Sequence, residues 1–144
     1  MLPFADQRKP LSILIVEEDA VLRDGLLRLL ESEGHRVRAC DGREAPAALE
    51  RGHFELLITD VLFPGRRTLE AVIEWSRTAN RGRILGLCRF SRILPDYYLL
   101  LTAKLGIRVI LPKPFDRAQL SEALEEVFAD TQARWRGAAC AAVA

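Results

Sequence analysis

One short apolar run constrains the fold of this chain more than any other feature. Residues 56–58 (LLI) are three consecutive aliphatic side chains, without the polar alternation of a strand that faces water on one side. Such a run is typical of a strand buried on both faces, as in a parallel sheet covered by helices. Asp60 follows this run, and Pro64-Gly65 then gives a strong turn signal. We therefore predict that Asp60 lies at the carboxyl end of a central strand, where open α/β sheets bind their ligands.

Four more strands are predicted from apolar or alternating runs, at residues 12–16, 35–40, 84–88 and 109–111. Segments with helical periodicity separate and follow the strands, at residues 20–33, 43–51, 69–79, 95–105 and 117–128. Asp19 and Asp116 are predicted N-caps, Asp116 in a capping box with Gln119, and Gly34 is predicted to end the first helix. The βαβαβαβαβα order predicts a parallel sheet with right-handed crossovers and helices on both faces. His35, at the turn before the second strand, is expected to be solvated.

Length and charge limit the number of domains and the class of partner. The 144 residues suit a single domain, which we place at residues 11–130. A flexible leader at 1–10 precedes it, and a tail at 131–144, either helical or disordered, follows it. The net charge of +1 favours neither nucleic acid nor a membrane surface as a partner. The three cysteines lack the spacing of a zinc site or a disulfide framework, so we expect reduced thiols and a cytoplasmic protein.

Chemically distinctive residues follow four of the five predicted strands. Glu17 and Glu18 come after the first strand, Asp60 after the third, Cys88 ends the fourth, and Lys113 follows the fifth. Because parallel strands end at the same edge, these side chains should converge. Three carboxylates in one pocket cannot all stay ionised unaided, and a lysine together with a divalent cation resolves the repulsion. Oxygen ligands favour Mg²⁺ over zinc, and a metal, a lysine and a carboxylate nucleophile are what phosphoryl transfer to Asp60 requires.

Three motifs at this edge resemble those of one known family. The chain carries VEED at residues 16–19, ITDVLFPG at 58–65 and LPKPF at 111–115. In this order and spacing they resemble the receiver domain of two-component response regulators, over about residues 11–130. The resemblance implies a flavodoxin-like (βα)5 fold, a doubly wound α/β sandwich whose five-stranded parallel sheet has the order 2-1-3-4-5.

The resemblance also implies roles for single residues. Asp60 would be the phosphoacceptor, with Glu17, Glu18 and the backbone carbonyl of Leu62 as further ligands of Mg²⁺ or Mn²⁺. Lys113 would contact the phosphoryl group, and a cis peptide would join it to the proline that follows. The phosphoryl donor would be a histidine kinase or a histidine phosphotransfer protein. The protein would then be a switch that catalyses only its own phosphorylation and dephosphorylation, and not an enzyme that acts on other substrates.

Four positions depart from the usual pattern of the family. Glu18 stands where Asp is usual, and its extra methylene carries the carboxylate ~1.5 Å further out. Cys88 and Arg89 stand where a Ser or Thr and a small residue are usual. Both are candidate phosphate contacts: Cys88 is a weak donor, and Arg89 either grips the phosphate or obstructs the pocket. Ile110 replaces the switch aromatic on the fifth strand, so the usual coupling between Cys88 and this position is not expected in its common form.

The predicted fourth helix has more apolar residues than a core-facing stripe needs. Tyr97, Tyr98 and Leu101 belong to this helix, and Ile110 belongs to the strand that follows it. We predict that the face built from the fourth helix, the fifth strand and the fifth helix serves for self-association or binds a downstream partner protein.

Three interpretations of function remain open from the sequence. The first is a stand-alone receiver that is phosphorylated on Asp60 and signals through protein contacts. The second is a degenerate receiver, which binds proteins without being phosphorylated, as Glu18, Cys88, Arg89 and Ile110 suggest. The third is a small flavodoxin-like redox or nucleotide-binding protein, although no glycine-rich phosphate loop follows the first strand. A DNA-binding regulator is expected only if this chain is a fragment of a longer one.

Overall fold

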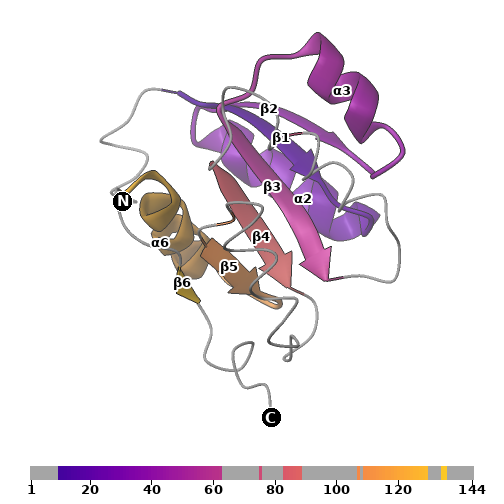
Figure 1. The fold of residues 1–144 in the computed structure, drawn as a ribbon. Coiled ribbons are helices and arrows are strands. Elements are labelled where there is room, and N and C mark those ends of the chain that lie inside the picture. The colour runs from indigo at the N-terminus through magenta and orange to yellow at the C-terminus, as the bar shows by residue number, and fades with distance from the viewer. Residues whose placement is uncertain are drawn as a thin grey trace.

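A parallel sheet runs through the molecule, as the buried aliphatic run predicts (Figure 1). The computed structural model describes residues 10–62, 75, 83–88, 107 and 109–129, together with the backbone of 134–135. Within this part the strands have the order β2-β1-β3-β4-β5-β6, and neighbouring strands are parallel. The bounds are β1 Ser12–Val16, β2 Arg36–Cys40, β3 Leu56–Leu62, β4 Ile84–Cys88, β5 Val109–Pro112 and β6 Arg134–Trp135. The predicted order 2-1-3-4-5 and the flavodoxin-like fold class are confirmed.

The sixth strand was not predicted. Its two residues pair with β5, Arg134 beside Val109 and Trp135 beside Ile110. A strand of two residues is too short to show any periodicity, so the sequence gives no signal for it. In the described part of the chain, β6 covers the edge that β5 would otherwise present.

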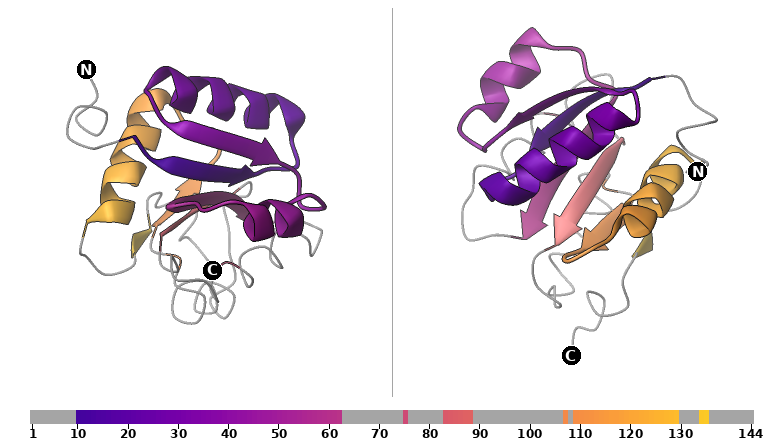
Figure 2. Two further views of the ribbon diagram at one scale, coloured as in Figure 1. Left: turned by 90° about the horizontal axis from the view of Figure 1, so that it is seen from above. Right: turned by 180° about the vertical axis from the view of Figure 1, so that it is seen from behind.

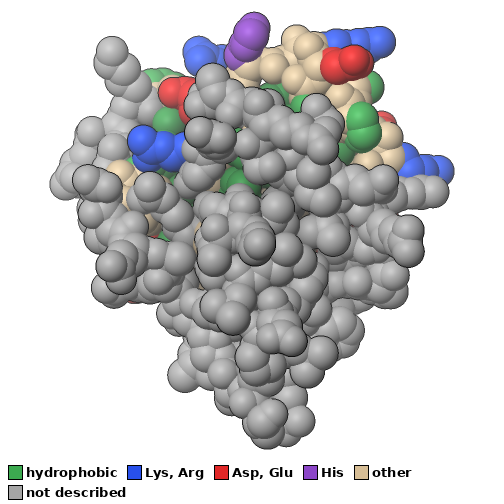
Figure 3. All heavy atoms as spheres, viewed as in Figure 1, with side chains coloured by type: hydrophobic (Ala, Val, Ile, Leu, Met, Phe, Trp, Pro, Cys, Tyr) green, Lys and Arg blue, Asp and Glu red, His purple; other side chains and the backbone are tan. Residues whose placement is uncertain are grey.

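In the described part of the chain, three helices cover the two faces of this sheet. They are α2 Ala20–Ser32, α3 Ala45–Arg51 and α6 Arg117–Phe128. Figure 2 shows α2 and α6 on one face and α3 on the other. Charged side chains of both signs lie over the α3 end of the face seen in Figure 3. The predicted helices at 69–79 and 95–105 lie outside the described residues, except for Trp75, which is helical and buried.

The predicted helix ends agree with the structure. The Asp19 carboxylate caps α2 by accepting hydrogen bonds from the backbone amides of Val21 and Leu22. Asp116 caps α6 in the predicted capping box with Gln119. Gly34 follows α2 with φ +94°, a left-handed conformation that glycine adopts without strain.

Two hydrophobic cores pack against opposite faces of the sheet. Leu26, Leu30 and the apolar face of α6 meet Ile13, Ile15 and Ile58 on one side. On the other side, Ala45 and Ala48 of α3 and the ring of Trp75 meet residues that include Leu14, Val16 and Leu57. Side chains of β1 and β3 therefore point alternately into both cores, which explains their continuous apolar runs.

His35 is buried, contrary to the expectation that it is solvated. It retains only 6% of its exposed surface, and its Nδ1 atom accepts a hydrogen bond from the Leu11 amide at 3.0 Å. The local sequence is typical of a turn, but Leu11, the residue just before β1, contacts the ring through this hydrogen bond. Burial outweighs the nearby Glu33 and Glu55 carboxylates and lowers the pKa of His35, so the ring is neutral at pH 7.

The outer strand β2 lies at the edge of the sheet opposite β6. Its burial alternates, with the Arg36 and Arg38 side chains exposed and Cys40 buried. None of the helices that the structure describes combines the length and hydrophobicity needed to cross a lipid bilayer.

Candidate functional site

The predicted convergence at the carboxyl edge of the sheet is centred on Asp60. Strand β3 extends two residues beyond Asp60, so the acid lies within the strand and not just after it. Asp60 pairs with Leu87 and Leu62 with Cys88, which leaves Val61 as an extra residue in a β-bulge. A bulge re-aims the side chains beside it, and here it accompanies an aspartate that is only 4% exposed.

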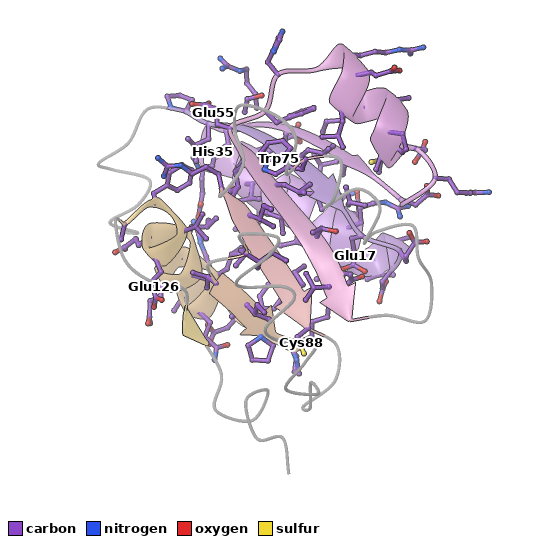
Figure 4. The ribbon with its side chains drawn as sticks, in the orientation of Figure 1. Glu17, His35, Glu55, Trp75, Cys88 and Glu126 are labelled. Carbon is purple, nitrogen blue, oxygen red and sulfur yellow. The ribbon has the colours of Figure 1, made fainter. Side chains whose placement is uncertain are left out.

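Lys113 joins Asp60 to Glu17. Its Nζ atom lies 2.6 Å from Asp60 Oδ1 and 2.8 Å from Glu17 Oε1. The backbone of Lys113 is held by its amide, which donates to the Cys88 carbonyl at 2.8 Å. The peptide from Lys113 to Pro114 is cis, as predicted. Glu17 directly follows β1, Asp60 lies near the end of β3 and Lys113 directly follows β5, and together they form one ion-paired cluster. Figure 4 shows Glu17 and Cys88 near this edge.

The charge balance of this cluster is unusual for a buried aspartate. Burial raises the pKa of Asp60 to about 7, and the Glu17 carboxyl adds to the shift while Lys113 opposes it. Burial alone would lower the pKa of Lys113, but Asp60 and Glu17 outweigh it and the pKa is raised. Lys113 therefore stays charged, whereas Asp60 gains or loses its proton close to neutral pH.

Backbone groups and Arg23 hold Glu17 in place. Its second carboxylate oxygen, Oε2, accepts a hydrogen bond from the Asp19 amide at 2.9 Å. The Arg23 guanidinium donates to the Glu17 carbonyl at 2.7 Å, from the first turn of α2. Arg23 was not among the predicted site residues. The available signal was its position near the start of the predicted helix, six residues after Glu17.

Glu18 does not join the other two carboxylates in this structure. Its Oε2 atom accepts a hydrogen bond from the Gly42 amide at 2.6 Å, in the loop between β2 and α3. In the described part of the chain, no three Asp, Glu, His or Cys side chains are grouped so as to hold a metal ion. The extra methylene of Glu18 and the buried amide of Gly42 account for this difference.

Comparison with known proteins identifies the family. Residues 13–125 match the family model of the response regulator receiver domain. The chain belongs to this family. It is 32% identical over 124 residues to the transcriptional regulatory protein PdtaR of Mycobacterium tuberculosis, an alignment of 84% of this chain and 58% of PdtaR. The receiver therefore spans little more than half the length of this curated relative.

Two solved structures of receivers resemble this fold. The chemotaxis response regulator CheY4 of Vibrio cholerae has a TM-score of 0.69 at 25% identity, over 83% of this chain and 100% of CheY4. The response regulator TrrA of Thermotoga maritima, solved in complex with Mg²⁺-BeF, has a TM-score of 0.65 at 24% identity, over 81% of this chain and 98% of TrrA. Receiver domains are signalling proteins that receive input from kinases or phosphotransfer proteins and pass it to downstream partners.

The structure locates some of the residues predicted for phosphate contact and switching in this receiver. Cys88 ends β4 and Ile110 lies in β5, and both are fully buried. Ile110 belongs to the hydrophobic core, so its predicted place in an exposed partner surface is wrong. The two described cysteines, Cys40 and Cys88, form no disulfide in the structure. Arg89, Tyr97, Tyr98 and Leu101 lie outside the described residues.

The donor set of this receiver fits Mg²⁺ in part. Mg²⁺ usually binds one or two carboxylates and keeps several waters. Glu17 and Asp60 supply two carboxylates at one edge of the sheet, already bridged by the Lys113 ammonium. The backbone of Leu62 lies at the end of β3, and Glu18 is adjacent to Glu17 but bound to Gly42.

Proposed function

We propose that this receiver accepts a phosphoryl group on Asp60 from a histidine kinase or a histidine phosphotransfer protein. The observation that carries the proposal is the cluster of Asp60, Lys113 and Glu17 at the carboxyl edge of the sheet. An aspartate placed there, with a cation within 2.6 Å, combines a nucleophile with a partner for phosphoryl oxygens.

In the proposed reaction an Asp60 carboxylate oxygen attacks the phosphorus of a phosphohistidine. The new O–P bond forms as the N–P bond breaks, and the histidine nitrogen keeps the electron pair and takes up a proton. Lys113 stabilises the negative charge on the equatorial oxygens of the phosphoryl group. Because the pKa of Asp60 is raised to about 7, the nucleophilic carboxylate form increases as the pH rises through neutrality.

A Mg²⁺ ion (or Mn²⁺) would be held by Glu17 and Asp60, with Glu18 and the Leu62 carbonyl as further proposed ligands. Such an ion neutralises the charge that builds up between the acceptor carboxylate and the phosphoryl oxygens. Glu17 is fixed for this role by Lys113 and the Asp19 amide, whereas Glu18 must leave Gly42.

The output is proposed to pass through protein contacts of a stand-alone, cytoplasmic receiver. The surface built from the fourth helix and α6 would bind a downstream protein or a second copy, with Tyr97, Tyr98 and Leu101 as contacts. Cys88 and Arg89 are proposed phosphate contacts, and Cys88 and Ile110 are the proposed switch pair. Burial of Cys88 and Ile110 suits a role in which they repack and do not bind partners directly.

Intact mass spectrometry tests the proposed phosphorylation. The full chain is incubated with acetyl phosphate and Mg²⁺, and a single adduct of about 80 Da is expected, as for one added phosphate. Asp60→Asn should abolish this adduct. Asp24→Asn, which changes an exposed acid on α2, is the matched control and should leave it unchanged. An unmodified wild-type chain, or an adduct that survives in Asp60→Asn, would refute the proposal.

One observation favours the second interpretation, a degenerate receiver that binds partners without phosphorylation. Asp60 and Glu17 are already paired with Lys113, and the Glu18 carboxylate already accepts the Gly42 amide, so each of the three carboxylates has a partner within the protein. Absence of the mass adduct under saturating acetyl phosphate and Mg²⁺ would favour this module. The flavodoxin-like redox interpretation has no observation in its favour now that the family is shown.

A further inference from the structure

The loop between β2 and α3 is tied to the acidic edge through one side chain. Glu18 follows Glu17 directly, yet its Oε2 atom accepts the Gly42 amide at 2.6 Å. Glu17 and Glu18 therefore point to different partners. Glu17 forms an ion pair with Lys113, and Glu18 accepts a hydrogen bond from the loop.

The Gly42 amide has the Glu18 carboxylate as its hydrogen-bond acceptor. Gly42 is buried with the Glu18 carboxylate in place, although Glu18 itself is an exposed residue. A buried donor that loses its acceptor is strongly unfavourable, and the chain avoids it by moving until the donor meets water. If the Glu18 carboxylate turns away, the Gly42 amide must find water or another acceptor, and the loop loses its hydrogen bond to the acidic edge.

The loop would move together with the start of α3. Asp41 Oδ1 accepts hydrogen bonds from the Arg43 and Glu44 amides, and Asp41 in turn donates its amide to the Glu44 carboxylate. These contacts make residues 41–44 one unit, and Ala45, the first residue of α3, follows at once. A shift at Gly42 is thereby passed to α3.

The other end of the loop is anchored independently of any side chain. The Glu17 amide donates to the Cys40 carbonyl at 3.0 Å, which holds the end of β2 beside the end of β1. This hydrogen bond joins two backbone groups and involves no side chain that could bind a cation. Motion triggered at Glu18 is therefore confined to the residues after Cys40.

We propose that Glu18 is a positioning residue that couples occupancy of the cation site to the β2–α3 loop. Without a cation its carboxylate holds Gly42. With a divalent cation beside Glu17 and Asp60, the carboxylate turns to the cation and releases the loop and the N-terminal turn of α3. A divalent charge attracts a carboxylate more strongly than a neutral amide does, and the extra methylene of Glu18 gives the side chain reach to both positions. The inference rests on the proposed function only in requiring that the site bind Mg²⁺.

Amide NMR of the ¹⁵N-labelled full chain during titration with MgCl₂ tests this coupling. At saturating Mg²⁺ the Gly42 amide proton should move upfield, and its hydrogen exchange should accelerate by about tenfold or more, as expected when a charge-assisted hydrogen bond is lost. The amides of Glu17 and Lys113 report binding of Mg²⁺ in the same spectra.

Two variants separate coupling from a purely structural role. Glu18→Gln keeps an acceptor for Gly42 but lacks the charge, so its Gly42 amide should stay protected at Mg²⁺ concentrations that saturate the wild type. Glu18→Ala should leave Gly42 unprotected with or without Mg²⁺. Glu31→Gln, the same change at an exposed position of α2, should behave like the wild type. If Glu18→Ala fails to fold, Glu18→Gln still decides the matter.

The failures of the two proposals look different. If the Glu17 and Lys113 amides shift with Mg²⁺ while Gly42 stays protected, the coupling is refuted and phosphorylation of Asp60 is untouched. A Glu18→Gln chain whose Gly42 amide responds like that of the wild type refutes it as well. If Mg²⁺ shifts no amide at the site and acetyl phosphate gives no mass adduct, both proposals fall.

Discussion

The Lys113 ammonium lies 2.6 Å from the Asp60 carboxylate, in a cluster where both side chains are largely withdrawn from water. The same ammonium contacts Glu17, so a single positive charge faces two carboxylates. The stability of the cation-free protein should therefore depend on this lysine and on the protonation of Asp60.

Replacing Lys113 should destabilise the fold. Lys113→Met leaves two adjacent buried carboxylates without a counter-charge, and we expect a loss of about 2–4 kcal/mol at pH 8. Urea denaturation without divalent cations measures the loss, which should shrink at pH 6 as Asp60 takes up a proton. Arg28→Met, which removes an exposed ion pair with Asp24, should cost less than about 0.5 kcal/mol. Equal losses for the two variants would show that the Lys113 contacts contribute little.

Asp60→Asn should stabilise the cation-free protein at alkaline pH. The pKa of Asp60 is raised from 3.8 to about 7 in the fold, so the folded state binds a proton that the unfolded state releases between these values. The stability contributed by this proton is complete below about pH 4 and is lost as the pH rises through 7. An asparagine at this position does not titrate, so it adds no such dependence of stability on pH.

The difference between Asp60→Asn and the wild type should consequently grow with pH. We expect about 2–4 kcal/mol in favour of the variant at pH 8, and little difference near pH 4. Urea denaturation in the presence of a chelator, at several pH values, measures both curves. A variant that is less stable than the wild type at pH 8 would contradict the assigned direction of the Asp60 pKa shift.

Acid should weaken the packing around His35. Its pKa is lowered mainly by burial, and a protonated ring can no longer accept the Leu11 amide at Nδ1. The unfolded state thus binds a proton more readily, and stability falls as the pH drops below the ordinary value of 6.5. His35→Asn keeps an acceptor but cannot titrate. The denaturation midpoint of this variant should change less between pH 7 and 5 than that of the wild type, and parallel curves would refute the assignment.

Gly86 should not tolerate a side chain. A Cβ atom there would lie 2.9 Å from Val61 Cγ1 and 3.3 Å from Ile107 Cγ2, both in the core. Gly86→Ala should lower the free energy of unfolding by about 1–3 kcal/mol through overpacking. Adding Val61→Ala to Gly86→Ala removes the closest contact and should cost less than the two single changes together.

Gly25 is the contrasting position for the same measurement. It lies in α2 with no atom within 4 Å of an added Cβ. Gly25→Ala should raise the free energy of unfolding by up to about 1 kcal/mol, because alanine favours the helix. Thermal or urea denaturation of both variants tests the pair, and destabilisation at Gly25 would contradict the open space seen there.

The sequence predicted the cluster of Asp60, Glu17 and Lys113 because two simple rules suffice for it. Aliphatic runs mark buried parallel strands, and parallel strands bring their carboxyl ends to one edge. Helix caps at Asp19 and Asp116 were equally accessible, since a cap is satisfied by amides only two or three residues away.

Other features depend on contacts that no local pattern reports. The hydrogen bond between Glu18 and Gly42 joins a side chain to a backbone amide 24 residues away. The sequence agrees equally with a Glu18 carboxylate that points to the acidic cluster and with one that points to the loop. The sequence around His35 is typical of a turn, and its contact with the Leu11 amide, 24 residues away, is not visible in any local pattern. The bulge at Val61, which extends β3 past Asp60, likewise arises from the register with β4.

The exposed arginines of β2 have a consequence for how copies of this protein behave together. An edge strand presents unpaired amides and carbonyls to any other extended chain, and self-templated growth of sheets into aggregates begins at such edges. Arg36 and Arg38 project from this outer strand. If a second copy paired its own β2 with this strand, its two arginines would lie close to them. Like charges brought together in this way repel, so the two arginines disfavour pairing of β2 with the same strand of a second copy.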